Sequence, residues 1–286
     1  MRYFYFFILI LILFPSCEVI NPDEDVPSNI NISSFDFKAD VGQGSSLAEI
    51  SDSWVYVSGE LIGAFEMPTI IPVLTSGVQT IEIRPGVLLN GIAGTRTINP
   101  FFTTYKLEHN FESGKTEVIE PKSTYVDGVV FPWNNRGEED FEEGGISIDS
   151  VPGSPTKMVK TTEDVFEGEY SGMVSLDMQH KKYIGQSKNV FNLPKSGAYV
   201  VMEINVKNVT TPLNIGMYVN LNTGQVKDVP HITINPTSDW KKLYINFTEL
   251  VSYYNNAIGY RVYFKAELGD NTSSTIYVDN IKIMHF

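Results

Sequence analysis

The segment from Ile258 to Glu267 reads Ile-Gly-Tyr-Arg-Val-Tyr-Phe-Lys-Ala-Glu. Tyr260, Val262 and Phe264 fall at alternate positions, with Arg, Tyr and Lys beside them. Side chains of a β-strand point to opposite faces in turn, so this alternation predicts a strand with one buried face. No long stretch of the chain has the 3.6-residue periodicity of a helix. Together with 15 Tyr, 17 Phe and many turn-forming Gly and Pro residues, the pattern predicts an all-β protein.

Short segments of this kind recur along the chain between turn signals, a spacing that predicts sandwiches or barrels. In the first half the predicted strands are 33–39, 54–57, 61–65, 79–84, 105–111 and 116–119, while 69–71, bracketed by two prolines, suits an edge strand or a bend. In the second half they are 146–148, 158–160, 173–178, 198–206, 214–221, 241–247, 258–268 and 275–284. A change of composition over 121–138 predicts a linker. We therefore expect one domain over 33–120 and another over 139–286.

The N-terminus predicts export. Arg2 precedes the apolar run 3–14, which is shorter than the roughly 20 residues that a transmembrane helix needs. An ordinary secretory signal is one interpretation. The segment Leu13-Phe14-Pro15-Ser16-Cys17 is also similar to a bacterial lipoprotein box, although it has a proline where that family usually has a small residue. The resemblance implies that residues 1–16 are a signal peptide and that Cys17, the only cysteine, is acylated.

Residues 17–32 are acidic, contain prolines and lack periodicity, which predicts a solvated tether. The cluster Asp23-Glu24-Asp25 resembles the surface-export signal of Bacteroidota lipoproteins, which implies an outer-membrane protein that faces the cell exterior. The net charge of −13 repels phosphate groups, so we expect no nucleic-acid partner. A single cysteine allows no internal disulfide. The acylated Cys17 is then the expected contact with the lipid bilayer.

The first domain contains Val55-Tyr56-Val57-Ser58-Gly59-Glu60-Leu61-Ile62-Gly63, followed by Pro68, Leu74 and Gly77 before Ile81-Glu82-Ile83. This order is similar to that of a PEGA-type surface β-domain and covers about residues 54–86. The motif of that family consists of turn and core residues. The resemblance therefore implies a small β-sandwich scaffold without catalytic groups.

Four segments of the second domain occur in a characteristic order. They are Asp140-Phe141-Glu142-Glu143-Gly144, then 165–172, then Asp239-Trp240-Lys241-Lys242-Leu243, and finally 276–283. In this order they resemble carbohydrate-binding modules of the galactose-binding-like jelly roll. The resemblance implies a jelly-roll β-sandwich, a glycan ligand and a core position for Trp240.

In that family a structural Ca²⁺ ion often lies at one end of the sandwich. By position, the resemblance implies Glu142 and Asp279 as its carboxylate ligands. Backbone carbonyls near 167–171 would complete the six to eight oxygens that Ca²⁺ prefers. The simpler interpretation is that Glu142 is solvated and that Asp279 hydrogen-bonds to a bulge.

Alternation also predicts a face for a sugar. Tyr218 and Asn220 share one face of their strand, Arg261 and Tyr263 share one face of theirs, and Glu203 points outward from 198–206. If these strands belong to one sheet, tyrosine rings can stack on sugar CH groups while amide and charged groups bind hydroxyls. Every antiparallel sheet of this kind has a solvated face, so a plain surface is the alternative.

The acidic run near the start of the second domain fits the spacing Glu-x-Asp-x-x-Glu at Glu138, Asp140 and Glu143. This spacing resembles the carboxylate set of one jelly-roll glycosidase family. Here the intervening residues are largely charged and lie at a domain edge, so we expect no catalysis. The four histidines lack metal-ligand spacing, and no Gly-x-Ser-x-Gly elbow is present.

We therefore expect a lipid-anchored, non-catalytic surface protein that binds a glycan through its second domain. The alternative is a structural or assembly component of an outer-membrane complex, with other envelope proteins as partners. A polysaccharide hydrolase is a second alternative, and it requires the three acidic residues named above to line one cleft.

Overall fold

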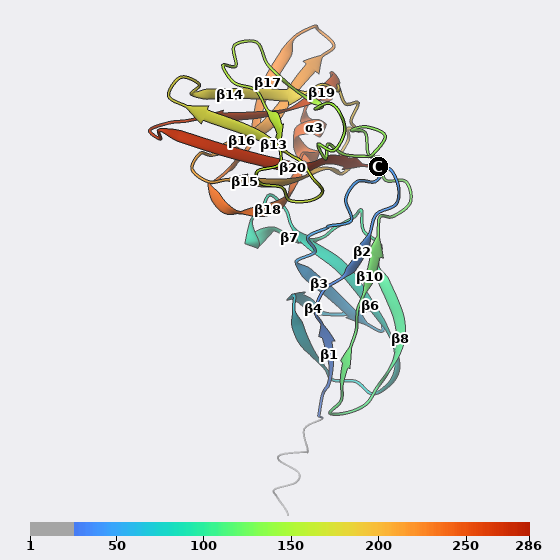
Figure 1. Cartoon of the computed structure of the whole chain (residues 1–286). Coiled ribbons are helices and arrows are strands. Elements are labelled where there is room, and N and C mark those ends of the chain that lie inside the picture. The colour runs from blue at the N-terminus through green and yellow to red at the C-terminus, as the bar shows by residue number, and fades with distance from the viewer. Residues whose placement is uncertain (1–25) are drawn as a thin grey trace, which may run out of the picture.

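The computed structural model describes residues 26–286 and shows two β-rich domains in series (Figure 1). The predicted signal peptide 1–16, the acylated Cys17 and the tether up to residue 25 lie outside the described residues. Within the described part, the helical segments are the single 3₁₀ turn η1 (Ala93–Thr95) and the helix α3 (Thr248–Tyr253). No helix among these residues is long and apolar enough to cross a bilayer.

The first domain is a β-sandwich built from strands β1 to β10. One sheet has the order β4 (Glu60–Glu66), β3 (Asp52–Val57), β6 (Gly77–Leu88) and β7 (Arg96–Ile98), with β8 (Tyr105–Phe111) also paired to β6. The facing sheet has the order β5 (Thr69–Val73), β1 (Ser28–Ile32) and β9 (Thr116–Val118). A short pair joins β10 (Lys122–Thr124) to β2 (Asp36–Lys38).

The core of this domain consists of apolar side chains from alternate positions of the strands, as the sequence predicts. Ile81 and Ile83 are fully buried against Ile30 and Ile71 of the facing sheet. The predicted hairpin at Ser58-Gly59 is confirmed, because β3 pairs with β4 and both turn residues have positive φ. Two-residue hairpins favour this left-handed geometry.

Three expectations for the first domain need correction. The strand predicted to end before Pro85 continues as β6 to Leu88. Pro85 lies where β6 changes partner from β8 to β7, so its missing N–H falls between two ladders. Strand β1 begins at Ser28, inside the range predicted as tether, and β10 forms inside the range predicted as linker.

The second domain is a jelly-roll β-sandwich of two five-stranded sheets. The first sheet has the order β11 (Ile148–Ser150), β14 (Lys182–Ser187), β19 (Ala257–Glu267), β16 (Leu213–Leu221) and β17 (Val226–Ile234). The second has the order β12 (Val159–Thr161), β13 (Ser171–Asp177), β20 (Ser273–His285), β15 (Val200–Asn208) and β18 (Thr237–Asn246). Every pairing in both sheets is antiparallel.

The inward faces of these sheets form the largest apolar cluster. Tyr260, Val262 and Phe264, the residues whose alternation predicted a strand, are all buried in it. Trp133 is the tryptophan of this cluster. Trp240 was expected in the core but is partly exposed, with its indole N–H donating to Asp164 Oδ1 at 2.7 Å. It lies on an outward face because β18 alternates about Leu243 and Ile245, which point inward.

The sequence did not predict two strands of the second domain, β14 and β17. Strand β17 is an edge strand that contains Pro230, beside the extra residue His231 where its register against β16 shifts, and most of its residues are polar or exposed. Strand β14 contains Gly185, over which the ring of Tyr183 folds. Both strands lack the apolar run by which the others were recognised.

The two domains share a third apolar cluster at their junction. Phe37, Val87, Phe101, Phe102 and Tyr125 of the first domain meet Val201, Tyr244 and Met284 of the second. Backbone hydrogen bonds also cross the junction, from Asn90 N–H to the Tyr244 carbonyl (2.7 Å) and from Val130 N–H to the His285 carbonyl (2.8 Å). The predicted linker is therefore packed: its Tyr125, Trp133 and Glu138 are all buried.

Candidate functional site

The jelly roll has two outward faces, and they are used differently. We call the outward face of the β11–β14–β19–β16–β17 sheet the open face; its polar residues include Lys182, Asn214, Tyr218, Asn220, Asp228, Arg261, Tyr263, Lys265 and Glu267. We call the outward face of the other sheet the covered face; it carries Val201, Glu203, Asn205, Lys242, Tyr244, Asp279, Lys282 and Met284. The first domain packs on the covered face, so the open face is turned away from it (Figure 1).

Strand register brings four of the five predicted ligand residues together on the open face. Tyr218 pairs with Arg261, and Tyr263 pairs with Gly216, across β16 and β19. Asn220 follows two residues after Tyr218 on the same side. The rings of Tyr218 and Tyr263 have centroids 4.9 Å apart. The sequence thus predicted the composition of this face, and ligand binding by it stays a prediction.

Tyr263 forms the floor of the face. Its ring lies over Gly216, where a Cβ atom would collide with the phenol and with the Val229 carbonyl. Only 1% of Tyr263 is exposed. Burial and the neighbouring Asp228 carboxylate raise the pKa of the Tyr263 phenol, which is therefore neutral at physiological pH. Glycine at 216 is what allows an aromatic ring to lie flat on the sheet here.

Lys265 covers part of both tyrosine rings. Its ammonium lies 3.8 Å from the ring centroid of Tyr263 and 5.0 Å from that of Tyr218. The same ammonium is 2.5 Å from Asp228 Oδ2. Cation–π contacts and a partly exposed ion pair are both weak, about 0–1 kcal/mol each, so Lys265 can move without a large cost.

A shallow hollow lies beside the tyrosines. It has a volume of about 400 Å³ and is lined by Lys182, Asn214, Asp228, Pro230, Tyr263, Lys265, Ala266 and Glu267. Amide, ammonium and carboxylate groups here offer both donors and acceptors beside an aromatic surface. Sugar rings are bound by such a mixture, since their hydroxyls need directed partners and their CH groups need an apolar face.

Arg261 closes one edge of the open face. Its Nη1 donates to the carbonyl of Ser187 at 2.6 Å and to the carbonyl of Lys188. These bonds hold the guanidinium against the segment that follows β14. Arg261 is thus fixed in position beside Tyr218, which is its partner in the strand register.

Glu203 is not part of this face, which corrects the prediction. Strand β15 belongs to the other sheet, so Glu203 points onto the covered face and is 0% exposed. Its carboxylate lies 3.3 Å from Lys242 Nζ and 3.7 Å from Lys282 Nζ, and it accepts a 3.4 Å hydrogen bond from Tyr125 Oη. Alternation along one strand identifies its two sides but not the sheet that the strand joins.

The charges around Glu203 connect the two domains. Burial alone would raise the pKa of Glu203, but Lys282 and Lys242 outweigh it and the pKa is lowered, so Glu203 is ionised. Lys282 also donates to the carbonyls of Gln43 (3.1 Å) and Ser45 (3.3 Å) in the first domain. A buried charge of this kind is stable only while all its partners are present.

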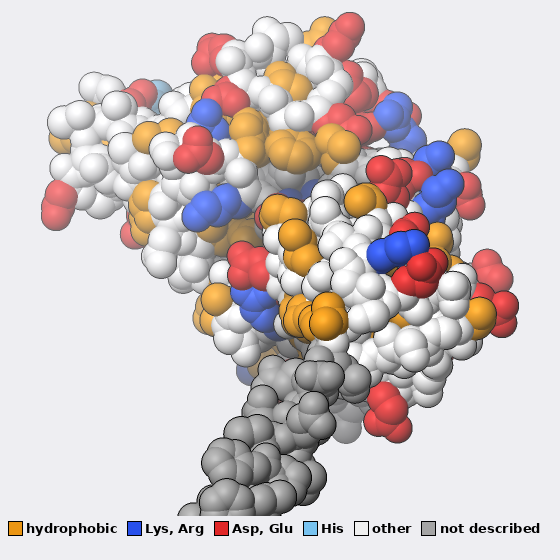
Figure 2. Space-filling view, turned by 90° about the horizontal axis from the view of Figure 1, so that it is seen from below, with side chains coloured by type: hydrophobic (Ala, Val, Ile, Leu, Met, Phe, Trp, Pro, Cys, Tyr) orange, Lys and Arg blue, Asp and Glu red, His pale blue; other side chains and the backbone are white. Residues whose placement is uncertain are grey.

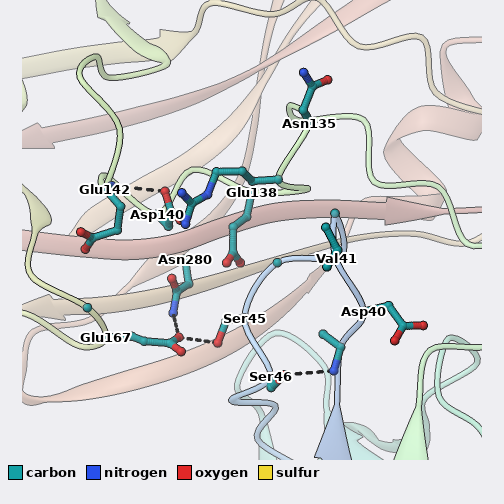
Figure 3. Close-up of a pocket in the computed structure, with 15 residues that line it drawn as sticks. Asp40, Val41, Ser45, Ser46, Asn135, Glu138, Asp140, Glu142, Glu167 and Asn280 are labelled. Atoms are coloured by element: carbon teal, nitrogen blue, oxygen red, sulfur yellow. Dashed lines mark hydrogen bonds and ion pairs between the residues drawn. The ribbon is translucent and has the colours of Figure 1, made fainter.

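An interdomain cavity of about 580 Å³ contains part of the acidic run (Figure 3). It lies between residues 39–46 of the first domain and Asn135, Glu138, Asp140, Glu142 and Asn280 of the second. Glu138 is 3.3 Å from Lys282, and burial raises the pKa of Glu138 against the opposing effect of that lysine. Asp140 is paired with Arg136. Asp140 and Glu143 also line a second hollow from which Glu138 is absent, so the three acidic residues do not share one cleft.

The predicted calcium ligands are held by hydrogen-bond donors. Glu142 Oε1 accepts the backbone N–H groups of Glu169 (2.8 Å) and Tyr170 (2.9 Å). Asp279 Oδ2 accepts those of Phe166 and Glu167 at 3.2 Å each, and its Oδ1 accepts that of Asn280 at 2.9 Å. A calcium site needs six to eight oxygen ligands from carboxylates, carbonyls and water, and the resemblance implied carbonyls of this loop among them.

In this arrangement the 166–170 loop presents N–H groups to both carboxylates where the resemblance implied carbonyl oxygens, which disfavours a Ca²⁺ ion here. Within residues 26–286, no three Asp, Glu, His or Cys side chains converge as metal ligands. Burial raises the pKa of Asp279 to about 7, with the three N–H groups acting in the opposite direction.

Comparison with known proteins gives structural neighbours only. No protein-family model and no curated protein matches the sequence. The xylan-binding CBM22-1 domain of Paenibacillus barcinonensis Xyn10C is similar over 52% of this chain and 92% of its own, with 16% identity and a TM-score of 0.39. The family 11 carbohydrate-binding module of Clostridium thermocellum Lic26A-Cel5E covers 52% of this chain and 94% of its own, with 14% identity and a TM-score of 0.36.

A third neighbour has an enzymatic description. The enzymatically active domain of bacteriophage CBA120 tailspike protein 4 covers 60% of this chain and 26% of its own, with 12% identity and a TM-score of 0.40. The structural neighbours of this chain thus include carbohydrate-binding modules, and the resemblance to a PEGA-type domain stays a prediction.

Sequence reasoning missed Asp228, which joins Lys265 and Tyr263 on the open face. The reason is that β17 was not predicted. The signal that the sequence offers is short: only Ile232 and Ile234 alternate, after Pro230.

Proposed function

We propose that this protein is a lipid-anchored, non-catalytic surface protein that binds a glycan on the open face of its jelly roll. The observation that carries the proposal is the pair of tyrosine rings 4.9 Å apart on β16 and β19, bordered by Asn220, Arg261 and Lys265. Tyr218 is the partly exposed ring and would stack on the sugar, while the polar groups would bind its hydroxyls.

The position of the face also supports this proposal. The first domain packs over Val201, Tyr244 and Met284 of the covered face and leaves Trp240 partly exposed at its margin, whereas the open face is turned away from the first domain and can be reached by a large ligand. It lies at the end of the molecule opposite the start of the described chain (Figure 1). A protein anchored through Cys17 at an outer membrane would hold this face outward.

We propose a non-catalytic role because carboxyl groups of the acidic run are held in ion pairs and hydrogen bonds. Glu138 is paired with Lys282, Asp140 with Arg136, and the Glu139 carboxylate with the backbone and side chain of Ser147. A glycosidase needs one carboxyl group free to donate a proton and another free to attack or activate water. These carboxyl groups instead hold the domain edge together.

The test is a polysaccharide screen with soluble residues 18–286, which contain every described residue. We expect binding to at least one polysaccharide, and loss of that binding in Tyr218→Ala. The matched control is Tyr253→Ala, because Tyr253 is an exposed tyrosine on α3, away from the open face. Two results would contradict the proposal: no binding to any polysaccharide of a broad screen, or binding that Tyr218→Ala leaves intact.

A structural role in an outer-membrane complex is the second candidate. It is favoured by one observation: Lys265 lies over both tyrosine rings and Tyr263 is only 1% exposed, which limits the aromatic surface that a sugar could reach. This role predicts that the full-length protein co-purifies with defined envelope proteins and has no affinity for polysaccharide.

A further inference from the structure

Three turns and the start of the described chain meet at one end of the first domain. Ser58 of the β3–β4 turn donates its N–H to the Thr80 carbonyl at 2.8 Å. Ser28 Oγ donates to the carbonyl of Thr75, in the β5–β6 turn, at 3.3 Å. Gly114, in the β8–β9 turn, donates its N–H to the Pro27 carbonyl at 3.1 Å. We call this end, made of 26–28, 58–62, 74–78 and 112–115, the tip.

The tip exposes large apolar side chains. The exposed fractions are 62% for Val26, 49% for Leu61, 39% for Ile62, 74% for Leu74 and 67% for Val78. Leu61, Ile62 and Leu74 border a hollow of about 440 Å³ together with Pro72. Figure 2 views the molecule from this end and shows apolar side chains beside the place where the described chain begins. Single exposed apolar residues are ordinary, but a group of them marks a contact surface.

Few charges interrupt this surface. Across the tip the ionic side chains are Glu60, Glu112 and Lys115, and the last two pair with each other at 2.6 Å. The whole protein has a net charge of −13, but the tip carries very little of it. A strongly basic or acidic partner would therefore find few opposite charges to bind at the tip. It suits an uncharged, apolar one.

The sequence limits how far the tip can lie from the membrane. Val26 lies nine positions after Cys17, and a fully extended chain spans at most about 3.3–3.6 Å per position, or about 30 Å in all. If Cys17 carries acyl chains buried in a bilayer, the tip can never lie farther than this from the lipid surface. The jelly roll, at the other end of the first domain, can.

We infer that the tip docks on the bilayer that holds the Cys17 lipid, with Leu74, Val78 and Leu61 entering its interfacial region. This inference rests on the acylation of Cys17 in the proposed function. Docking at a second point, besides the anchor, would orient the molecule so that the open face of the jelly roll is directed away from the membrane. The occupant is the lipid itself, without a requirement for anionic headgroups.

The test places an environment-sensitive dye at the tip. Because the chain has one cysteine and its sulfur would carry lipid, Leu74→Cys introduces the single free thiol for labelling. Tyr253→Cys is the matched control, since Tyr253 is 79% exposed on α3 of the jelly roll. The full acylated chain is reconstituted in phosphatidylcholine vesicles, with and without brominated acyl chains, and vesicle flotation is measured in parallel.

We expect both variants to float, and the dye at Leu74→Cys to shift to the blue and be quenched by brominated lipid, while the dye at Tyr253→Cys does neither. Flotation without quenching at Leu74→Cys would overturn the inference, as would equal quenching at both positions. Failure to float would overturn the acylation of Cys17 and the inference with it. Glycan binding, measured separately on soluble 18–286, would be unaffected by that failure.

Discussion

On the open face of the jelly roll, Tyr218, Arg261 and Lys265 remain partly exposed, whereas on the covered face Glu203, Lys242 and Lys282 are almost fully buried. Both sets come from strands with the same alternation of apolar and polar residues. The difference is that one sheet faces a neighbouring domain and the other does not. A polar outward residue is therefore a candidate ligand group on one face and part of a buried ionic network on the other.

The largest expected effect is on the covered face. Lys282→Met would leave Glu203 and Glu138 buried without their shared cation. We expect the free energy of unfolding to fall by about 3–5 kcal/mol, as when one partner of a buried ion pair is removed. Denaturant unfolding measures this. On the open face, Lys265→Met removes a partly exposed ion pair and should cost at most about 1 kcal/mol; equal losses would contradict the distinction between the faces.

The second effect is a pH dependence at the covered face. The pKa of Asp279 is raised by burial to about 7, compared with about 3.9 in an unfolded chain. Between pH 4 and 7 the folded protein therefore binds a proton that the unfolded chain has released, so this group makes stability fall as pH rises through that window. The slope is at most about 1.4 kcal/mol per pH unit.

Asp279→Asn is the control, because an uncharged side chain cannot contribute to that slope. Thermal unfolding at several pH values should show the variant gaining stability relative to wild type as pH rises from 4 to 7. A constant difference across this window would show that Asp279 titrates normally.

A pair of glycines sharpens the comparison further. Gly44 has φ of +79°, and a Cβ there would meet Lys282 Nζ at 2.8 Å, whereas a Cβ at Gly216 would meet the ring of Tyr263. We expect Gly44→Ala and Gly216→Ala each to cost about 1–3 kcal/mol of stability. Only Gly216→Ala should also weaken glycan binding, because it displaces the floor of the open face. Titration of both variants with the same glycan checks this.

A smaller effect is expected for a single ring on the open face. Tyr218→Ala removes the partly exposed stacking surface, and we expect about a tenfold loss of glycan affinity, equivalent to about 1.4 kcal/mol. Its stability should change by less than about 1 kcal/mol, since little buried surface is lost. Calorimetric titration gives the affinity. A folded Tyr218→Ala protein with unchanged affinity would move the site elsewhere.

The smallest effect concerns calcium. Because backbone N–H groups already hold the carboxylates of Glu142 and Asp279 in place, a chelator should leave the melting temperature unchanged. Thermal unfolding with and without chelator tests this, with added Ca²⁺ as the reverse experiment. A lower melting temperature in chelator would show that the 166–170 loop is arranged differently around an ion.

The all-β class and most strands could be predicted because alternation and turn residues are local signals. The presence of Tyr218 and Arg261 on one face followed from the same signal once both strands lay in one sheet, whereas their register did not. The placement of Glu203 could not be predicted, since sheet membership depends on contacts far apart in the sequence. Asp228 was missed because β17 is an exposed edge strand with a proline, and such strands need little apolar patterning.

The central claim is that one outward face of the jelly roll is open to a glycan and the other is closed by the first domain. Hydroxyl-radical footprinting of the soluble protein, without and with the glycan that it binds, tests this directly. We expect modification of Tyr218 in the free protein, protection of Tyr218 in the complex, and no modification of Tyr125 or Tyr244 in either state. Modification of Tyr244 to the same extent as Tyr218, or a Tyr218 signal that the bound glycan leaves unchanged, would contradict the claim.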